Sequence, residues 1–222
     1  GRLTSDAGIL LLREVDRRLG LIDAVNDAIP DPRDPGATVH EQRTMLAQRV
    51  FSIALGYEDL NDQQTMRTDA ALQVAAGVEA EEDQPMASPS TLCRLENRVF
   101  RKTLVRLSKN LVDQFNSSYQ APPEEITLDF DATDDAVHGQ QEGRFFHGYY
   151  RHYCFLPLYV FCGSQPLVAY LRPSKIDAAK HAKAIVKLLV EYLRQHWPDV
   201  KITIRGDGGF CRWKLMRWCE KH

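Results

Sequence analysis

The spacing of apolar residues changes once along this chain, from a helical repeat to a strict alternation. Near the start, apolar residues recur every three to four positions, which is typical of one face of a helix. Thr4, Ser5 or Asp6 is expected to cap this first helix, and Gly20 is expected to end it. Its apolar positions are Ile9, Leu10, Leu12, Val15 and Leu19.

Two further helices are predicted before residue 122. One is expected to open at Thr38 and to end at Gly56. Its predicted core face comprises Val39, Leu46, Val50, Ile53, Ala54 and Leu55. Ser88-Pro89 is a typical helix start, with a hydroxyl cap followed by proline, and predicts a helix that continues to about Val99. Between Ser88 and Lys109 the sequence has one acid and six basic residues, namely Arg94, Arg98, Arg101, Lys102, Arg106 and Lys109.

After Pro122-Pro123 apolar and polar residues alternate, which is typical of strands. Residues 126–133 are predicted as a strand that carries Asp129 and Asp131 on its polar side. Residues 145–161 are predicted as one long or broken strand, and residues 166–171 as a third strand antiparallel to it. A helix over residues 178–195, capped by Asp177 or Ser174, is expected to precede a fourth strand over residues 200–205 and a last helix.

This order of elements predicts an α/β fold with a mixed sheet. We place the main boundary at the two prolines, which gives a helical region of residues 1–121 and a mixed-sheet domain of residues 122–222. The sequence is 44% hydrophobic and 26% charged, which is ordinary for a globular protein and excludes a disordered, collagenous or disulfide-rich chain. With no run of ~18 apolar residues and no secretory signal pattern, no membrane partner and a cytoplasmic location are expected. The five cysteines are odd in number and have no C-x-x-C spacing, so we expect reduced, mostly buried thiols.

The net charge of −2 hides an uneven distribution. Residues 1–121 carry a net charge of −4, residues 122–143 carry −7 and residues 144–222 carry +9. An acidic stretch before a basic one is what a metal-dependent enzyme that acts on a polyanion needs. The alternative is an ordinary variation of charge over a solvated surface.

Two acids are placed where chemistry is expected. Asp131 lies near the end of one predicted strand, and Asp207 lies just after the end of another, beside glycines. If the two strands are neighbours, both carboxylates reach one divalent cation, and oxygen ligands favour Mg²⁺ or Mn²⁺. Two such ions activate a water and stabilise the leaving oxygen of a phosphodiester. The structural alternatives are a cap at Asp131 and an Asp-Gly turn at Asp207, and spacing does not separate Asp131 from its rival Asp129.

The motifs around these acids resemble those of bacterial insertion-sequence transposases, in the branch called transposase DDE domain group 1. The resemblance covers nearly the whole chain. It rests on residues 128–135 (LDFDATDD), 138–143 (HGQQEG), 148–150 with 156–158, 205–210 (RGDGGF), 54–62 (ALGYEDLND) and 88–97 (SPSTLCRLEN).

The resemblance implies a ribonuclease-H-like catalytic core behind a helical DNA-binding region. By it, Asp131 is the first catalytic carboxylate and metal ligand and Asp207 the second, and Asp131 is preferred over Asp129. It also implies double-stranded DNA as the partner, cleavage at transposon ends, and attack of the freed 3′-hydroxyl on target DNA. Two Mg²⁺ or Mn²⁺ ions are expected in the complete enzyme.

The third carboxylate of the family is a departure from this pattern. The family places a Glu on a helix well after the second Asp, whereas the sequence given ends at His222, and Glu220 lacks the expected context. We therefore expect a ribonuclease-H-like domain that is incomplete at its C-terminus and a chain that is inactive alone. The alternatives are a catalytically dead DNA-binding protein derived from a transposon and a nuclease of the same fold.

Basic residues of the helical region are the candidates for DNA contact. Arg94, Arg98, Arg101 and Lys102 are predicted to bind phosphates, and the alternative is a solvated helix face. Because two transposon ends must be brought together, a homodimer on DNA is predicted. Arg205 is expected to pair with an acid. His147 and His152 are expected to be hydrogen-bonded strand residues more than metal ligands.

Overall fold

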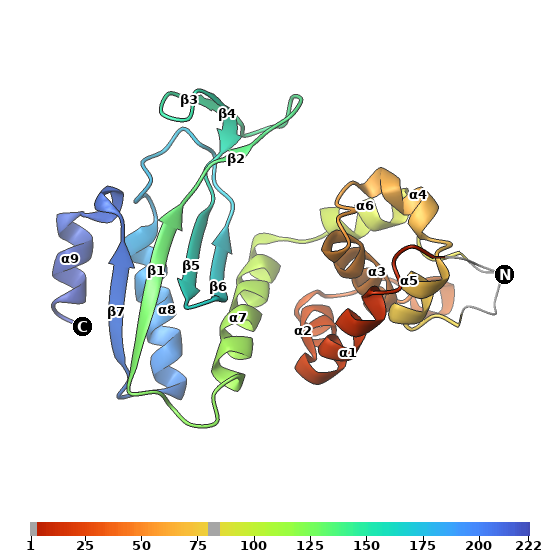
Figure 1. Ribbon diagram of the computed structural model, residues 1–222, viewed down its shortest axis with the longest axis horizontal. Coiled ribbons are helices and arrows are strands. Elements are labelled where there is room, and N and C mark those ends of the chain that lie inside the picture. Colours follow the sequence, from red (N-terminus) through yellow and green to blue (C-terminus); the bar gives the residue numbers. More distant parts are fainter. Residues whose placement is uncertain (1–3, 80–84) are drawn as a thin grey trace. The chain divides into compact units, whose positions relative to one another are not determined.

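The computed structural model describes residues 4–79 and 85–222, and the chain divides into two compact units (Figure 1). Residues 1–110 form unit 1 and residues 111–222 form unit 2. The described part of unit 1 is helical, and unit 2 is built on a mixed sheet, so the predicted α/β class is confirmed. None of the helices in the described ranges has the length and apolar character that crossing a membrane requires.

Unit 1 packs short helices around a core that includes Ile9, Ile22, Met45, Phe51 and Leu72. Its helices are α1 (Ile9–Leu19), α2 (Leu21–Ala28), η1 (Pro35–Ala37), α3 (Gln42–Ala54), η2 (Leu60–Asp62), α4 (Gln63–Met66), α5 (Ala70–Ala75), α6 (Pro89–Asn97) and α7 (Arg101–Ser117), of which α7 continues into unit 2.

The first helix ends at the predicted residue, but the predicted cap is wrong and α1 begins at Ile9. The residue before α1 is Gly8, which makes no side-chain cap, and the Thr4 hydroxyl instead accepts a hydrogen bond from the backbone N–H of Asp6. Gly20 ends α1 in the left-handed conformation, as predicted. Of the five predicted apolar positions only Ile9 is buried, because the long apolar stripe is wider than the face that α1 packs.

The second predicted helix starts four residues later than expected. The Thr38 hydroxyl donates to the carbonyl of Asp34 at 2.7 Å, which uses it in the turn of η1, and α3 begins only at Gln42. Val39 and Ile53 of the predicted core face are exposed, and Met45 and Phe51 are buried in their place. The helix start at Ser88 is confirmed, since its hydroxyl accepts from the Thr91 N–H and Pro89 lies in the first turn of α6.

Unit 2 contains a four-stranded sheet in the order β6-β5-β1-β7 and a small three-stranded sheet in the order β2-β4-β3. Its elements are β1 (Glu125–Ala132), β2 (Asp135–Ala136), β3 (Phe145–His147), β4 (His152–Phe155), β5 (Leu158–Cys162), β6 (Gln165–Tyr170), α8 (Ala182–His196), β7 (Lys201–Gly206), η3 (Gly208–Phe210) and α9 (Trp213–Cys219). Strand β1 is antiparallel to β5 and parallel to β7. The antiparallel pairing of β5 with β6 confirms the third predicted strand.

The predicted strand over residues 145–161 is three strands. The chain reverses after β3 at a turn in which the Arg151 N–H donates to the His147 carbonyl at 2.8 Å and Arg151 has a positive φ of 60°. Pro157 then separates β4 from β5, which agrees with the predicted interruption. Apolar and aromatic content predicted strand structure correctly here, but it did not reveal the reversal at residues 148–151.

Helix α8 also begins later than predicted, at Ala182. Asp177 accepts from the Ala179 N–H and pairs with Arg212, and the Ser174 hydroxyl donates to the Phe145 carbonyl. Both predicted caps therefore hold the loop before the helix. Within α8, Val186 is buried and Leu188 is exposed. The thiol prediction is wrong in part, because the cysteines are free but only Cys154 is buried.

The core of unit 2 lies against one side of the main sheet. Ile126, Leu128 and Phe130 of β1 are buried in a single cluster with residues of α8 and of the carboxyl-terminal part of α7. The alternate residues of β1, among them Asp129 and Asp131, leave on the opposite side of the strand. That side is where the sequence placed its candidate carboxylates.

Candidate active site at the ends of two parallel strands

Asp131 and Asp207 lie at the same end of two neighbouring parallel strands. The register pairs Asp129 with Arg205 and Phe130 with Gly206, and the two aspartates are the next residue on each strand. Side chains at matched positions of adjacent strands leave on the same face, and the strands are ~4.8 Å apart. The condition set by the sequence, that the two strands are neighbours, is therefore met, and both aspartates are exposed.

The turn after β7 fixes the position of Asp207. Its Oδ1 accepts a hydrogen bond from the Gly209 N–H at 2.8 Å, which begins η3. A Cβ at Gly206 would lie 3.1 Å from the Phe210 ring, and a Cβ at Gly209 would lie 2.8 Å from Asp207 Oδ1, so a side chain at Gly209 would displace the Asp207 carboxylate from its present position. The Asp-Gly turn that was the structural alternative is present. The hydrogen bond of this turn goes to Oδ1 of Asp207 and not to Oδ2.

Asp129, the rival of Asp131, is held by Arg205. The guanidinium donates from Nε to Asp129 Oδ1 and from Nη2 to Oδ2, the latter at 2.7 Å. The hydrogen bond from Arg205 lowers the pKa of the Asp129 carboxyl, and the positive charge of Arg205 adds to this effect. Burial opposes it to a smaller extent. The prediction that Arg205 pairs with an acid is confirmed.

Polar residues of the small sheet lie near Asp131. The Tyr150 hydroxyl donates to the Ala132 carbonyl at 3.5 Å. Burial raises the pKa of Tyr150, and the charges of Asp134 and Asp131 add to that effect. His152 Nε2 lies 2.7 Å from Asp134 Oδ2, but neither this nitrogen nor His147 Nδ1, both buried, makes a hydrogen bond among the described residues, so the prediction of hydrogen-bonded strand histidines is wrong at these two atoms.

The donor set at this end of the sheet fits a hard cation. Mg²⁺ is bound in proteins by one or two carboxylates together with waters and substrate phosphates, and Asp131 and Asp207 supply two such carboxylates from neighbouring strands. Within residues 4–79 and 85–222, no group of three or more His, Cys, Asp or Glu side chains is arranged to hold a metal ion. Glu220 follows α9 as its exposed cap residue and does not complete such a group.

The four candidate DNA contacts differ in their surroundings. Arg94, Arg101 and Lys102 are exposed on α6 and α7. Arg98 is only 18% exposed, and it donates from Nη1 to Asp31 Oδ1 at 2.9 Å and from Nη2 to the Gln42 side chain. Its charge is thus compensated inside unit 1, while a DNA role for any of the four stays a prediction.

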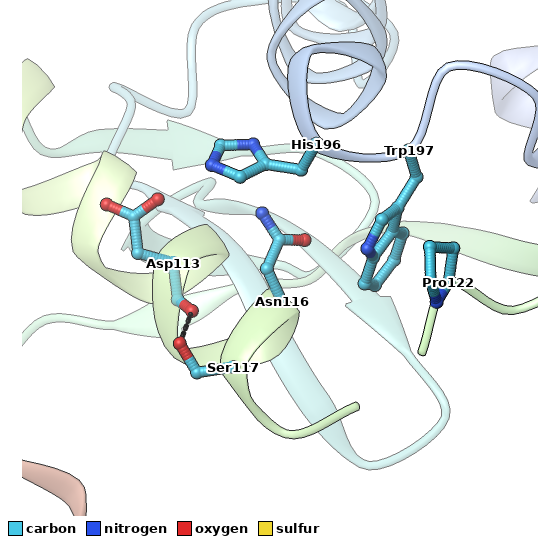
Figure 2. Close-up of a pocket in the computed structure, with 6 residues that line it drawn as sticks. All are labelled: Asp113, Asn116, Ser117, Pro122, His196 and Trp197. Carbon is cyan, nitrogen blue, oxygen red and sulfur yellow. Dashed lines mark hydrogen bonds between the residues drawn. The ribbon is translucent and has the colours of Figure 1, made fainter. Parts of the chain in front are cut away.

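Each unit also contains a cavity apart from the aspartates. In unit 2, a cavity of about 440 Å³ lies between the ends of α7 and α8 (Figure 2) and is lined by Asp113, Asn116, Ser117, Pro122, His196 and Trp197. Because Pro122 precedes β1 and His196 precedes β7, this cavity lies at the amino-terminal end of those strands, away from Asp131. In unit 1, a cavity of about 520 Å³ includes Arg33, His40 and Arg94 in its lining.

A mixed sheet in which β1 is parallel to the edge strand β7, with Asp131 near the end of β1 and Asp207 directly after β7, is consistent with a ribonuclease-H-like domain. The model of the family described as transposase DDE domain group 1 matches residues 1–222, and the chain belongs to this family. The resemblance inferred from the motifs is therefore confirmed. The comparisons with curated proteins and with solved structures gave no match.

Proposed function

We propose that this transposase-family chain, when it is completed by the family's third carboxylate, cleaves DNA at transposon ends and joins the freed 3′-hydroxyl to target DNA, and that it is inactive alone. The observation that carries the proposal is the register of β1 and β7, in which Asp131 and Asp207 directly follow the last matched pair. Two carboxylates at the carboxyl ends of adjacent strands form the simplest protein site for a Mg²⁺ ion that also contacts a phosphate.

In this proposal Asp131 and Asp207 hold Mg²⁺ or Mn²⁺, with a second ion in the complete enzyme. When bound, such ions make a water or hydroxyl more acidic and neutralise charge on the phosphate and the leaving oxygen. The chain's own residues position these groups. The Gly209 N–H fixes one oxygen of Asp207, and Arg205 keeps Asp129 in an ion pair. The carboxylate of Asp131 is left to bind the metal ion.

Unit 1 supplies DNA binding in this proposal. Arg94, Arg101 and Lys102 contact phosphates, and Arg98 supports them through its ion pair with Asp31. A homodimer on DNA brings the two ends together, in the bacterial cytoplasm where the element resides. The proposal also includes the domain boundary expected at residue 122, with DNA binding by residues 1–121 and catalysis by residues 122–222.

A nicking assay tests the catalytic part. The substrate is a supercoiled plasmid that carries the DNA flanking this coding region, incubated with Mg²⁺ and with the chain extended by a helix that carries the family's third carboxylate. Asp131→Asn and Asp207→Asn should each lower nicking on the order of 10²–10³-fold, as expected for losing a group that stabilises transition-state charge. Asp199→Asn, an exposed aspartate at the other end of β7, is the matched control and should nick as the wild type does.

The outcomes separate the candidate functions. Nicking followed by insertion into a second plasmid supports a transposase, whereas nicking without joining supports a nuclease of the same fold. Binding of the flanking DNA with no nicking in any metal supports a DNA-binding protein without catalysis. Equal nicking by the wild type and by both aspartate variants contradicts the proposed site.

A salt titration tests the DNA-binding part. Each phosphate contact that is lost reduces the slope of log K against log salt concentration by about 0.9. Arg101→Ala with Lys102→Ala should therefore flatten the slope by about 2, measured by fluorescence anisotropy on a duplex of the flanking sequence. Lys187→Ala on α8 is the control, since it removes an exposed charge from the other unit.

A further inference from the structure

The small sheet of unit 2 exposes aromatic rings that most proteins would bury. We call residues 144–155, which form β3, β4 and the turn between them, the aromatic hairpin. Three of its aromatic residues are about half exposed or more: Phe146 is 58% exposed, Tyr149 is 84% exposed and Tyr153 is 49% exposed. Burying a ring of this size is strongly favourable, so a cluster of exposed ones marks a contact surface.

These rings are arranged before any ligand arrives. Phe146 and Tyr153 are directly paired across β3 and β4, and their ring centroids are 5.7 Å apart in an edge-to-face arrangement. The guanidinium of Arg144 lies over the Tyr153 ring at 4.5 Å. Tyr149, in the turn, packs edge-on against Tyr150 at 5.0 Å. Strand pairing already holds the Phe146 and Tyr153 rings in place. Stacking a flat ligand on them therefore costs the protein little conformational entropy.

The charge around the rings selects the kind of ligand. From residue 144 to residue 176 the sequence has no acid and four basic residues. One of them, Arg172, is buried, and the other three are Arg144, Arg151 and Lys175. Lys175 Nζ lies 5.7 Å from the centre of the Phe145 ring, so cations alternate with rings on this surface. Exposed aromatic rings interleaved with cations are how proteins bind unpaired nucleic acid strands.

The aromatic hairpin lies next to the candidate active site. Strand β1 leads from Asp131 into β2, which pairs with β4, and Figure 1 shows this small sheet at the end of the main sheet where β1 ends. The Tyr150 hydroxyl reaches the carbonyl of Ala132, the residue after Asp131. A strand whose phosphate lies at Asp131 therefore has bases within reach of this hairpin.

We propose that the aromatic hairpin stacks unpaired bases of the DNA strand that is cut or joined at Asp131 and Asp207. This inference rests on the proposed function, and it adds a single-stranded subsite to it. Stacking on Phe146, Tyr149 and Tyr153 is tolerant of base identity, because every base has a π face. Arg144 and Arg151 bind the phosphates between the stacked bases.

The test compares two probes in EDTA, so that no cleavage occurs. One is a fluorescent blunt 30-base-pair duplex of the flanking DNA, and the other is the same duplex with four unpaired thymidines at its end. The wild-type chain should bind the overhang probe more tightly. Phe146→Ala and Tyr149→Ala should each weaken overhang binding roughly tenfold, the effect of losing one stacked base, and should leave blunt binding within about twofold.

Matched variants separate stacking from loss of fold. Phe146→Trp keeps a ring and should retain the overhang preference. Leu188→Ala removes an exposed apolar side chain from α8 and should bind both probes as the wild type does. Tyr149 lies in a turn, so Tyr149→Ala tests the proposal even if Phe146→Ala fails to fold.

Three results would overturn this inference alone. The first is a wild-type chain that binds blunt and overhang probes equally. The second is a loss that is the same for both probes, which would make the hairpin a contact for duplex DNA. The third is no loss in Phe146→Ala and Tyr149→Ala, which would leave the rings for a protein partner. A wild-type chain that binds neither probe would overturn both the proposed function and this inference.

Discussion

Arg205 and Asp129 form a two-point ion pair across β1 and β7, two positions before Asp131 and Asp207. The two residues are matched in the strand register, and the guanidinium donates to both oxygens of the carboxylate. This pair uses the carboxylate that spacing alone did not separate from Asp131. It also joins the two strands just before Asp131, which is still in β1, and Asp207, which begins the turn after β7.

The ion pair predicts different effects for two neighbouring aspartates. Asp131→Asn should abolish or strongly weaken Mn²⁺ binding by the chain, because it removes a proposed ligand. Asp129→Asn should leave Mn²⁺ affinity within about threefold and should lower the free energy of unfolding by about 1 kcal/mol or less, as for other exposed ion pairs. The measurement is the signal of free Mn²⁺ by electron paramagnetic resonance. A larger loss of affinity in Asp129→Asn than in Asp131→Asn would make Asp129 the ligand.

Much of unit 2 was predictable because its signals are local. Alternation in β1 placed Ile126, Leu128 and Phe130 in the core, and the glycines after β7 placed Asp207 in a turn at the strand end. Spacing could not choose between Asp129 and Asp131, because both leave β1 on the same side. The choice depends on Arg205, which is 76 residues away in sequence.

Other features were missed because they depend on distant partners. Arg98 was predicted as a DNA contact, and its pairing with Asp31 across 67 residues has no signal in the spacing of either residue. The late starts of α3 and α8 have the same origin, since Thr38 and Asp177 are used as turn and loop partners. The aromatic content of residues 144–155 was visible, but it could not show which rings remain exposed.

The pairing of Asp31 with two arginines predicts acid sensitivity in unit 1. Asp31 accepts from Arg33 at 2.6 Å and from Arg98 at 2.9 Å, and the Arg33 hydrogen bonds hold the pKa of Asp31 well below its usual range, with the Arg98 charge adding. Because the folded-state pKa is lowered, the stabilisation is fully present above about pH 4 and is lost as the pH falls from there towards the folded pKa.

Asp31→Asn should therefore destabilise unit 1 by roughly 1 kcal/mol at pH 7 and by less at pH 3. Urea unfolding followed by circular dichroism at both pH values measures this change. All three tryptophans lie in unit 2, so tryptophan fluorescence should give an unchanged transition. Asp27→Asn, an exposed aspartate of α2, is the control. An equal loss at both pH values would show that the effect of Asp31 is not ionic.

Arg172 predicts a large loss of stability in unit 2. It is 1% exposed, and it donates to the carbonyls of Leu156 at 2.8 Å, Lys180 at 2.6 Å and Ala178 at 3.1 Å. This side chain fastens the segment between β4 and β5 to the loop before α8. Burial lowers the pKa of Arg172, so the charge is carried at a cost that the carbonyls offset.

Arg172→Ala leaves three carbonyls without their donor and opens a cavity, so it should lower the free energy of unfolding of unit 2 by about 3 kcal/mol. Arg172→Lys keeps the charge with fewer donors in a different geometry and should lie between the alanine variant and the wild type. Urea unfolding followed by tryptophan fluorescence measures both. Lys187→Ala, on the exposed side of α8, should change the value by less than about 0.5 kcal/mol. An Arg172→Ala variant as stable as the wild type would refute this assignment.

Tyr192 and Asp113 predict the response of unit 2 to alkali. The Tyr192 hydroxyl donates to Asp113 Oδ1 at 2.7 Å, and burial first, then this bond and the Asp113 charge, raises the pKa of Tyr192 to about 12. Because the folded-state pKa is raised, the contribution to stability is fully present below pH 10 and is lost as the pH rises from 10 through about 12.

Tyr192→Phe should lower the free energy of unfolding by about 1 kcal/mol at pH 8 and should reduce the further loss between pH 10 and 12. Tryptophan fluorescence in urea measures both values, and Tyr149→Phe, which removes an exposed hydroxyl, should leave the value at pH 8 unchanged. A Tyr192→Phe variant that loses as much stability between pH 10 and 12 as the wild type would place the alkaline transition on another group.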